Sequence, residues 1–195
     1  MKINCKNILK SEKQKKFIII HLYGTHAFYS SRYPEEYNFF KNNPKTIFLN
    51  EKSKELINTY DNAVRYNDFI ISEIINETKK TNSKSFVLFL SDHGEEVFDE
   101  ENFAGHSDLK LTKTMFDIPF VLWRSKKFID DDKKTYDLDK KHSAEDLIYT
   151  LSDLSNIKFK EFDSTRSLFN KNYIERNRII SKKMIYEKTY YDKKD

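Results

Sequence analysis

The chain has 195 residues, about the size of one domain, and 38% of them are hydrophobic and 15% aromatic, which is enough bulky apolar side chain to build a core. Its 35 basic and 31 acidic residues give a net charge of +4 and are mixed along the chain, whereas nucleic-acid-binding proteins gather basic residues into a patch. We therefore expect a single domain over 1–195 and no nucleic-acid partner, with the Lys-rich stretches 10–16 and 182–194 solvated.

The first apolar run, Phe17–Leu22, is rich in β-branched and aromatic residues and predicts a strand buried on both faces. His21 lies inside this run and is expected to be a core histidine. The run is too short for a transmembrane span or the core of a signal peptide, so neither is predicted. Cys5 is the only cysteine, which excludes a disulfide within the chain.

An amphipathic helix is predicted from Ser53 to about Lys80, because apolar residues recur there at helical spacing. Two further buried strands follow, at Ser85–Leu90 and Ile118–Trp123. The order strand, helix, strand is typical of α/β proteins. Later segments predict a helix that starts with a capping box at Ser143 and ends near Leu154, a solvated His142 ahead of that helix, and a short strand over 178–181.

The segment from Ser91 to about Asp117 is predicted to be a long loop, and it contains the residues best suited to chemistry. Asp92 and His93 follow a predicted buried strand directly, at the end where α/β sheets place their ligand crevices, and Gly94 lets backbone approach a bound group. Oxygen and imidazole ligands suit zinc or manganese. His106, thirteen positions after His93, and His26, after the first strand, are expected to reach the same rim of a largely parallel sheet.

Two motifs carry a resemblance to a known family: Ser91-Asp-His-Gly-Glu95 with the later His106, and His21-Leu-Tyr-Gly-Thr-His-Ala-Phe-Tyr-Ser-Ser-Arg-Tyr-Pro34. They resemble the bacterial phosphoethanolamine transferases of the alkaline-phosphatase and sulfatase superfamily, which decorate lipid A and core sugars. Three further segments are similar to that family in the same order, so the resemblance extends over about 16–181: Tyr60–Asp68, Asp117–Phe120 and Asp163–Leu168. It implies a sulfatase-like α/β fold, with a mostly parallel sheet flanked by helices, that is incomplete at the N-terminus.

The resemblance also implies a chemistry. The family's zinc ion is held by a Glu, a nucleophilic Thr, and an Asp and a His that match Asp92 and His93. The histidines that match His26 and His106 lie by the phosphate, with three roles open to them as catalytic candidates: binding substrate, protonating the leaving group, or holding a second divalent metal. The implied reaction moves phosphoethanolamine from phosphatidylethanolamine to lipid A or a cell-surface sugar, in an inner-membrane enzyme with a periplasmic catalytic domain.

The chain departs from the family's pattern before Phe17. The family's Glu ligand and nucleophilic Thr precede the strand that matches Phe17–Leu22, but residues 1–16 contain no Thr, and Glu12 is their only acid. The nucleophile is therefore expected to be absent, and two remaining ligands predict weak zinc binding. Alternative interpretations are a sulfatase or phosphodiesterase-type hydrolase of the same superfamily, a non-catalytic remnant, or a subunit that completes a site with a separate N-terminal half.

Overall fold

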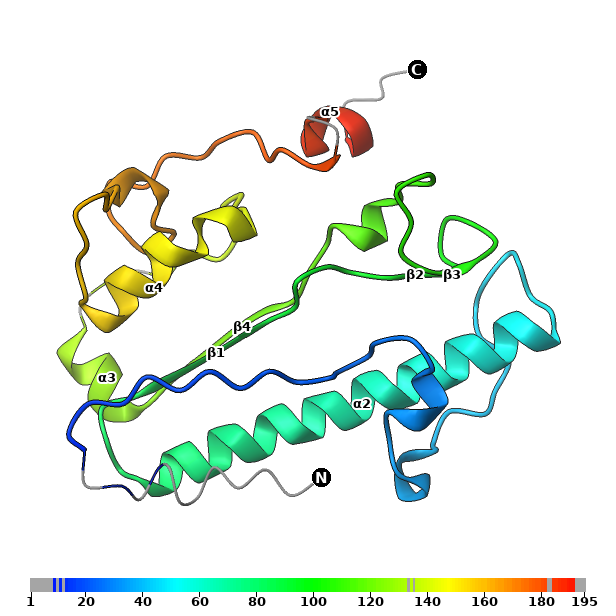
Figure 1. Cartoon of the computed structure of the whole chain (residues 1–195), viewed down its shortest axis with the longest axis horizontal. Coiled ribbons are helices and arrows are strands. Elements are labelled where there is room, and N and C mark those ends of the chain that lie inside the picture. The colour runs from blue at the N-terminus through cyan, green and yellow to red at the C-terminus, as the bar shows by residue number, and fades with distance from the viewer. Residues whose placement is uncertain are drawn as a thin grey trace. The chain divides into compact units, whose positions relative to one another are not determined.

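The computed structural model of the chain describes residues 9, 11, 13–132, 134, 136–181 and 184–191. Cys5 lies outside these residues, as do positions 10, 12, 182, 183 and 192–194 of the two Lys-rich stretches. The chain divides into two compact units, 1–129 and 130–195, which we describe one at a time (Figure 1); the single-domain organisation stays a prediction.

The first unit contains, in chain order, η1 (Tyr29–Ser31), η2 (Glu35–Tyr37), α2 (Glu51–Lys80), β1 (Phe86–Leu90), β2 (Glu96–Val97), β3 (Ala104–Gly105), η3 (Lys113–Met115) and β4 (Phe120–Arg124). Helix α3 (Lys126–Asp131) crosses the boundary, and the second unit contains η4 (Ala144–Asp146), α4 (Leu147–Ser155), η5 (Ser164–Arg166) and α5 (Tyr186–Tyr190). The described helices all lack the length or the apolar composition that crossing a bilayer would need.

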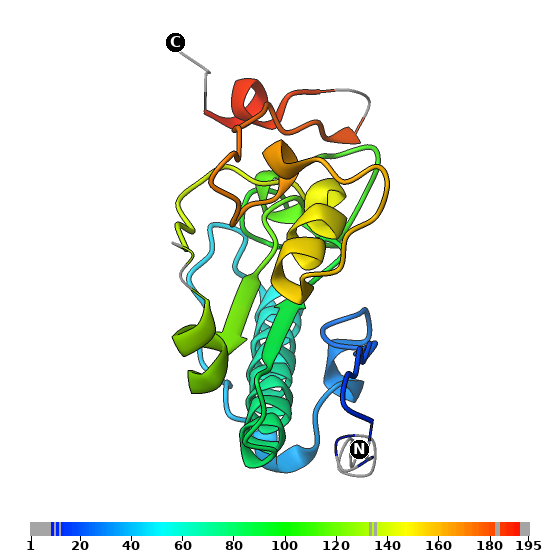
Figure 2. The same cartoon turned by 90° about the vertical axis from the view of Figure 1, so that its left-hand side faces the viewer.

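Helix α2 runs along β1 and β4 in both ribbon views (Figures 1 and 2). A capping box fixes its start, because the Asn50 side chain accepts a hydrogen bond from Ser53 N–H at 3.0 Å and Ser53 Oγ accepts one from Asn50 N–H at 2.8 Å. The helix predicted from Ser53 is thus confirmed, with a start at Glu51. On its inner side the buried Asn62 accepts hydrogen bonds from the N–H groups of Phe39 and Phe40, both at 2.8 Å, and so anchors the preceding loop to the helix.

Strands β1 and β4 form a two-stranded antiparallel sheet, in register from Phe86↔Arg124 to Leu90↔Phe120. Both were predicted, and β4 begins directly after Pro119, which has no N–H group for a ladder. All five residues of β1 are only half-buried. The expected sheet that holds both Phe17–Leu22 and β1 is not seen among the described residues, where β1 pairs with β4.

The strand predicted at Phe17–Leu22 is wrong in a specific way: the segment runs as an extended trace (Figure 1), but it pairs with no strand among the described residues. In the described part of the chain, no backbone hydrogen bond joins it to another segment's backbone. Its odd-numbered residues are exposed, Phe17 at 67% and Ile19 at 80%, and its even-numbered residues are half-buried. His21 is therefore exposed and is not a core histidine, because only a strand with neighbours on both edges would bury it.

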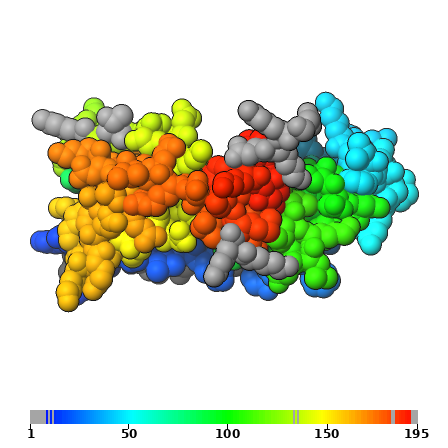
Figure 3. Space-filling model, turned by 90° about the horizontal axis from the view of Figure 1, so that it is seen from above, coloured from blue at the N-terminus to red at the C-terminus, as the bar shows by residue number. Residues whose placement is uncertain are grey.

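The segment 91–117 is ordered into the β2–β3 hairpin and η3, although it had been expected to be one long loop. The hairpin pairs Glu96 with Gly105 and Val97 with Ala104. Thr46 Oγ1 donates a hydrogen bond to the carbonyl of Phe98 at 2.7 Å, which joins the loop ahead of α2 to this hairpin. The two segments lie side by side in the space-filling view, in cyan and green (Figure 3).

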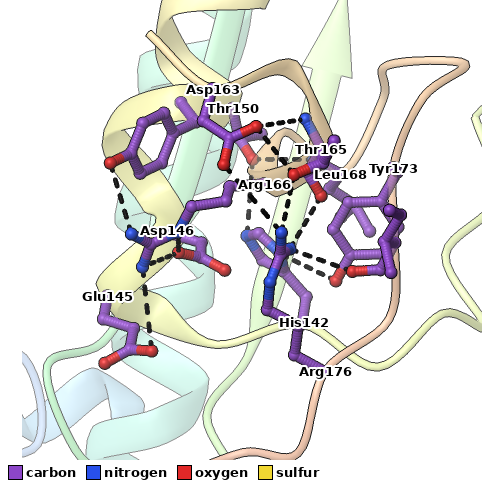
Figure 4. Close-up of polar contacts among 12 residues, drawn as sticks. His142, Glu145, Asp146, Thr150, Asp163, Thr165, Arg166, Leu168, Tyr173 and Arg176 are labelled. Carbon is purple, nitrogen blue, oxygen red and sulfur yellow. Dashed lines mark hydrogen bonds and ion pairs between the residues drawn. The ribbon is translucent and has the colours of Figure 1, made fainter. Parts of the chain in front are cut away.

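In the second unit, the helix predicted from Ser143 is confirmed, but its capping box is wrong. The helix opens with η4, and Ser143 makes no side-chain cap hydrogen bond. The Asp146 carboxylate instead faces Arg166, whose Nε donates to Asp146 Oδ1 at 2.5 Å (Figure 4). A charged hydrogen bond to a guanidinium is stronger than one to a backbone N–H, so Asp146 joins α4 to η5.

The motif Asp163–Leu168 forms a polar cluster with its neighbours (Figure 4). Asp163 Oδ1 accepts from Thr165 N–H at 2.9 Å, and Arg176 donates to the Thr165 carbonyl at 2.8 Å. His142, expected to be solvated, is half-buried: its ring nitrogens lie 3.4 Å from the hydroxyls of Tyr173 and Thr150. The strand expected over 178–181 is reduced to one bridge, Ile179↔Ile185.

Candidate metal centre

His93, Glu95 and His106 come together beyond the carboxyl end of β1. One potential ligand atom of each lies within 4.8 Å of the others, and the two imidazole ring centroids are 4.3 Å apart. The β2–β3 hairpin causes this meeting: because Glu96 pairs with Gly105, Glu95 and His106 are the next pair across the hairpin. A site of this kind therefore depends on the register of two very short strands.

Hydrogen bonds orient the side chains of this group. His93 Nδ1 lies 2.7 Å from the carbonyl oxygen of Gly94, and donation of Nδ1–H to that oxygen leaves Nε2 with a free lone pair. Glu95 Oε2 accepts a hydrogen bond from the Tyr29 hydroxyl at 2.6 Å, and Glu95 Oε1 lies 3.2 Å from His106 Nδ1. Both oxygens of Glu95 thus have protein partners.

Tyr29 connects the group to the loop that follows Phe17–Leu22. The phenol is buried, and its ring packs edge-on against Tyr60 with centroids 5.1 Å apart. Burial and then the hydrogen bond to Glu95 raise the pKa of Tyr29 well above its ordinary value, so the hydroxyl stays protonated and donates. Phe28 beside it has a left-handed backbone with φ 65°, a strained conformation for a bulky residue of the kind that gathers at functional sites.

Gly94 is needed for the packing of the site. Its N–H donates to the Met115 carbonyl at 2.8 Å. A Cβ at this position would lie 2.0 Å from the Thr114 carbonyl oxygen and 2.9 Å from that of Asp117. Because both atoms are backbone, no side-chain rotation could relieve the clash. The glycine of the motif is therefore explained by the close approach of another backbone segment, whereas the sequence predicted close approach to a bound group.

Glu96 is completely buried, and its hydrogen-bond partners differ from those of Glu95. Its Oε1 accepts hydrogen bonds from three successive backbone N–H groups, those of Asp99 at 2.5 Å, Glu100 at 2.9 Å and Glu101 at 3.3 Å. Its Oε2 accepts one from Thr114 Oγ1 at 2.9 Å. A carboxylate with this many donors is well satisfied without a metal, so Glu96 holds the hairpin loop and the η3 segment in place.

The electrostatic surroundings of the group are acidic. Burial and then the charge of Asp99 raise the pKa of Asp61, while burial raises the pKa of Asp99 itself. Burial and then the charge of Glu95 raise the pKa of Tyr60. Burial is the larger cause of each shift, and the neighbouring carboxylates of Asp99 and Glu95 add to it.

Two of the four predicted site residues, His93 and His106, are brought together. Asp92 is exposed, its Oδ1 accepts a hydrogen bond from His93 N–H at 3.1 Å, and it is not a member of the described group. His26 is also outside the group, on the loop that carries Tyr29, where its carbonyl accepts from Arg32 Nε at 2.9 Å. The chemical roles of all four residues stay predictions.

Sequence reasoning missed Glu95, although the residue closes the Ser91–Glu95 motif. The available signal was its spacing, because residues two apart in extended chain point to the same face, which places Glu95 beside His93. The contact with His106 depends on the hairpin register, and that segment was taken for a loop.

Comparison with known proteins identifies the family. The sequence matches the sulfatase family over residues 4–157. It is 38% identical to the phosphoethanolamine transferase EptC of Escherichia coli strain RS218 over 89% of this chain, and 38% identical to the phosphoethanolamine transferase CptA of Salmonella typhimurium over 90%. The chain spans only 31% of the length of either enzyme.

Solved structures agree with the sequence match. The crystal structure of the C-terminal periplasmic domain of E. coli EptC in complex with Zn aligns with a TM-score of 0.88 at 34% identity, covering 97% of this chain and 57% of that one. Another crystal structure of the same domain gives 0.85 at 36% identity, covering 90% and 51%. The expected sulfatase-like fold is thereby confirmed, and the chain belongs to the sulfatase family.

Proposed function

We propose that this chain is the metal-binding part of a phosphoethanolamine transferase, which moves phosphoethanolamine from phosphatidylethanolamine to lipid A or a cell-surface sugar on the periplasmic side of the inner membrane. The observation that carries the proposal is the meeting of His93, Glu95 and His106, beyond a strand, within 4.8 Å. Its relatives are named phosphoethanolamine transferases, and one crystal structure of the E. coli EptC domain is a complex with Zn.

The donor chemistry fits zinc held by His93 and Asp92. Imidazole nitrogen and carboxylate oxygen are ordinary zinc ligands, and His93 Nε2 has the lone pair that a metal needs. Glu95 is the weaker ligand candidate because both of its oxygens already have partners, whereas the Asp92 carboxylate is exposed. A bound zinc ion would neutralise charge on phosphoryl oxygens and lower the pKa of a hydroxyl nucleophile.

The chain's own residues would position the substrate phosphate and donate a proton to the leaving oxygen. Glu95 holds His106 by Nδ1, which leaves Nε2 directed elsewhere to bind a phosphate oxygen or give a proton to the leaving oxygen. Tyr29 in turn fixes Glu95. His26, on the same loop as Tyr29, is the second candidate for the phosphate side or for a second divalent metal. We assign no nucleophile within this chain, so transfer needs a residue from elsewhere.

Calorimetric titration of the purified chain with zinc chloride tests the ligand assignment. We expect micromolar or weaker affinity at pH 7.5, falling at pH 5.5 because protons compete for imidazole nitrogen. Loss of either proposed ligand, in Asp92→Ala or His93→Ala, should weaken binding at least tenfold. The matched control is His21→Ala, which removes an exposed histidine outside the group.

Two results would change the assignment. Submicromolar affinity that survives the loss of both Asp92 and His93 would show that the proposed ligand pair is wrong. Binding that survives Asp92→Ala but is lost in Glu95→Gln and His106→Ala would make His93, Glu95 and His106 the ligands.

A second candidate role, a subunit that completes a site with another polypeptide, is favoured by coverage, since the chain spans 31% of its relatives. Incubation of the purified chain with fluorescent phosphatidylethanolamine and lipid A addresses this. We expect no transfer by the chain alone, because covalent transfer requires a nucleophile. Robust transfer that is abolished by His93→Ala would show that the nucleophile lies within these 195 residues.

A further inference from the structure

Arg32 makes three contacts with the loop 23–28, which carries His26. Its Nε donates a hydrogen bond to the His26 carbonyl at 2.9 Å, and its Nη2 donates one to the Ala27 carbonyl at 2.6 Å. Its guanidinium carbon lies 4.2 Å from the centroid of the Tyr23 ring. A planar guanidinium can bridge two acceptors and stack on an aromatic face at once, which an ammonium group cannot do. One side chain therefore holds two carbonyls and one ring of this loop.

The Tyr23 ring extends this hold to the imidazole of His26. The centroids of the two rings are 5.3 Å apart, with an angle of 54° between their planes, and the His26 N–H donates to the Tyr23 carbonyl at 3.2 Å. His26 is exposed, so burial does not fix its side chain. Its orientation depends instead on the backbone and the ring that Arg32 holds.

The loop reaches the candidate metal centre through a strained residue. Phe28 has a left-handed φ of 65°, and its carbonyl accepts hydrogen bonds from Ser31 N–H at 2.9 Å and from Ser31 Oγ at 2.7 Å. The next residue, Tyr29, is buried and donates to Glu95. Backbone strain of this kind persists only where the surrounding structure fixes it. Arg32 supplies contacts before Phe28, and Tyr29 supplies the contact after it.

We propose that Arg32 is a positioning residue, which holds the imidazole of His26 in the orientation that a phosphate ligand requires. The role of His26 towards phosphate rests on the proposed function. The guanidinium already uses two N–H groups and one face on the loop, so its effect on a phosphate passes through His26. Because Tyr29 is held by its own burial, loss of Arg32 should release His26 and leave Glu95 and His106 in place.

NMR spectroscopy of the isotope-labelled full chain tests this proposal, because the five histidines give separate imidazole signals. Arg32→Met keeps a long side chain but removes the donors. In this variant the His26 imidazole should lose its NOE contacts with the Tyr23 ring and should shift, because it leaves the ring current of Tyr23. The signals of His93 and His106 should stay in place, which also shows that the variant folds.

Two further variants control for charge and for stacking. Arg32→Lys keeps the charge but cannot bridge two carbonyls, so the His26 signals should change as in Arg32→Met; it also gives the comparison if Arg32→Met does not fold. Arg65→Met is the matched control. The Arg65 guanidinium lies 4.2 Å from the Phe39 ring centroid, as Arg32 does from Tyr23, but it donates no hydrogen bond to a described residue. Its loss should leave the His26 signals unchanged.

Titration with phosphoethanolamine separates positioning from direct binding. In the unaltered chain this probe should shift the His26 and His106 signals, and Arg32→Met should raise its dissociation constant at least tenfold. In a His26→Ala background, read from His106, loss of Arg32 should change the dissociation constant by less than twofold. Residues that act through one another are non-additive in this way.

Three results would overturn the proposal: unchanged His26 signals in Arg32→Met, full restoration of those signals by Arg32→Lys, or an equal effect of Arg65→Met. A further tenfold loss of affinity from Arg32→Met in the His26→Ala background would also overturn it, because Arg32 would then bind the phosphate directly. If phosphoethanolamine leaves His26 of the unaltered chain unaffected, the proposed function loses its phosphate side, whereas the imidazole signals still decide whether Arg32 positions His26.

Discussion

Substitution of Gly94 by alanine is the sharpest test of how the candidate site is built. Gly94 is not in the left-handed backbone region, so alanine meets no conformational penalty, and its cost is purely steric. The new Cβ would lie 2.0 Å from the Thr114 carbonyl oxygen, so the backbone must move by at least about 1 Å to reach a tolerable contact. Such overpacking costs about 1–3 kcal/mol, and loss of the 2.8 Å hydrogen bond to Met115 adds about 1 kcal/mol.

We therefore expect Gly94→Ala to lower the free energy of unfolding by about 3 kcal/mol, which is a fall of about 1.5 M in the urea midpoint at an m-value of about 2 kcal/mol/M. The single tryptophan, Trp123 in β4, reports the unfolding of this unit by fluorescence. Gly24→Ala is the control: its φ is +50°, but nothing lies closer than 4.0 Å to the new Cβ, so only the left-handed penalty of about 1–2 kcal/mol applies. A loss under 1 kcal/mol in Gly94→Ala, or one no larger than the control's, would refute the packing argument.

Three further substitutions test other contacts. Glu96→Gln should cost about 2–3 kcal/mol in the same fluorescence assay, because the neutral amide accepts more weakly from three backbone N–H groups, whereas Glu101→Gln on the surface should cost under about 1 kcal/mol; equal losses would contradict a special role. Burial lowers the pKa of His142 in the folded chain. Below about pH 6.5 the unfolded chain therefore binds a proton at this residue that the folded chain does not bind. The free energy of unfolding should then fall by up to about 1.4 kcal/mol per pH unit, until the pH reaches the lowered pKa of the folded chain. Urea unfolding followed by circular dichroism should show this slope flattened in His142→Gln and kept in His21→Gln. Arg166→Met leaves the buried carboxylate of Asp146 without a counter-charge and should lower the free energy of unfolding by about 2–3 kcal/mol. Faster hydrogen exchange of the α4 amides would show this loss, and unchanged exchange would mean that the ion pair contributes nothing to stability.

Sequence periodicity predicted the helices and strands whose own apolar pattern determines which side is buried. Helix α2 and strands β1 and β4 lie where the apolar patterns placed them, since a stripe of apolar residues needs only one covering layer. Phe17–Leu22 shows where such reasoning stops. Its composition fits an interior strand, but pairing requires a neighbour, and none of the described strands is placed to pair with it.

The candidate site likewise has parts that the sequence predicted and parts that it could not predict. The motif around His93 predicts the end of β1 as the place for chemistry. The residue type of Gly94 indicated a close backbone approach, but the atoms that approach it are the carbonyl oxygens of Thr114 and Asp117 and not a bound group. The approach of Glu95 to His106 could not be predicted, because it depends on a hairpin with two residues in each strand. Likewise, the sequence placed His142 in solvent, whereas partners 8 and 31 positions away along the chain half-bury it.

The two consecutive glutamates after Gly94 have a consequence for how this segment can vary in length. Glu95 faces the histidines and Glu96 faces the hairpin loop, because adjacent residues of extended chain point to opposite sides. Inserting or deleting one residue between Gly94 and Val97 would exchange the two directions. A single change of length would then remove both the buried acceptor of the hairpin loop, Glu96, and the carboxylate beside the histidines, Glu95. Homologous sequences that keep this site should therefore show length changes elsewhere in the hairpin, at its tip between β2 and β3, but none at this point.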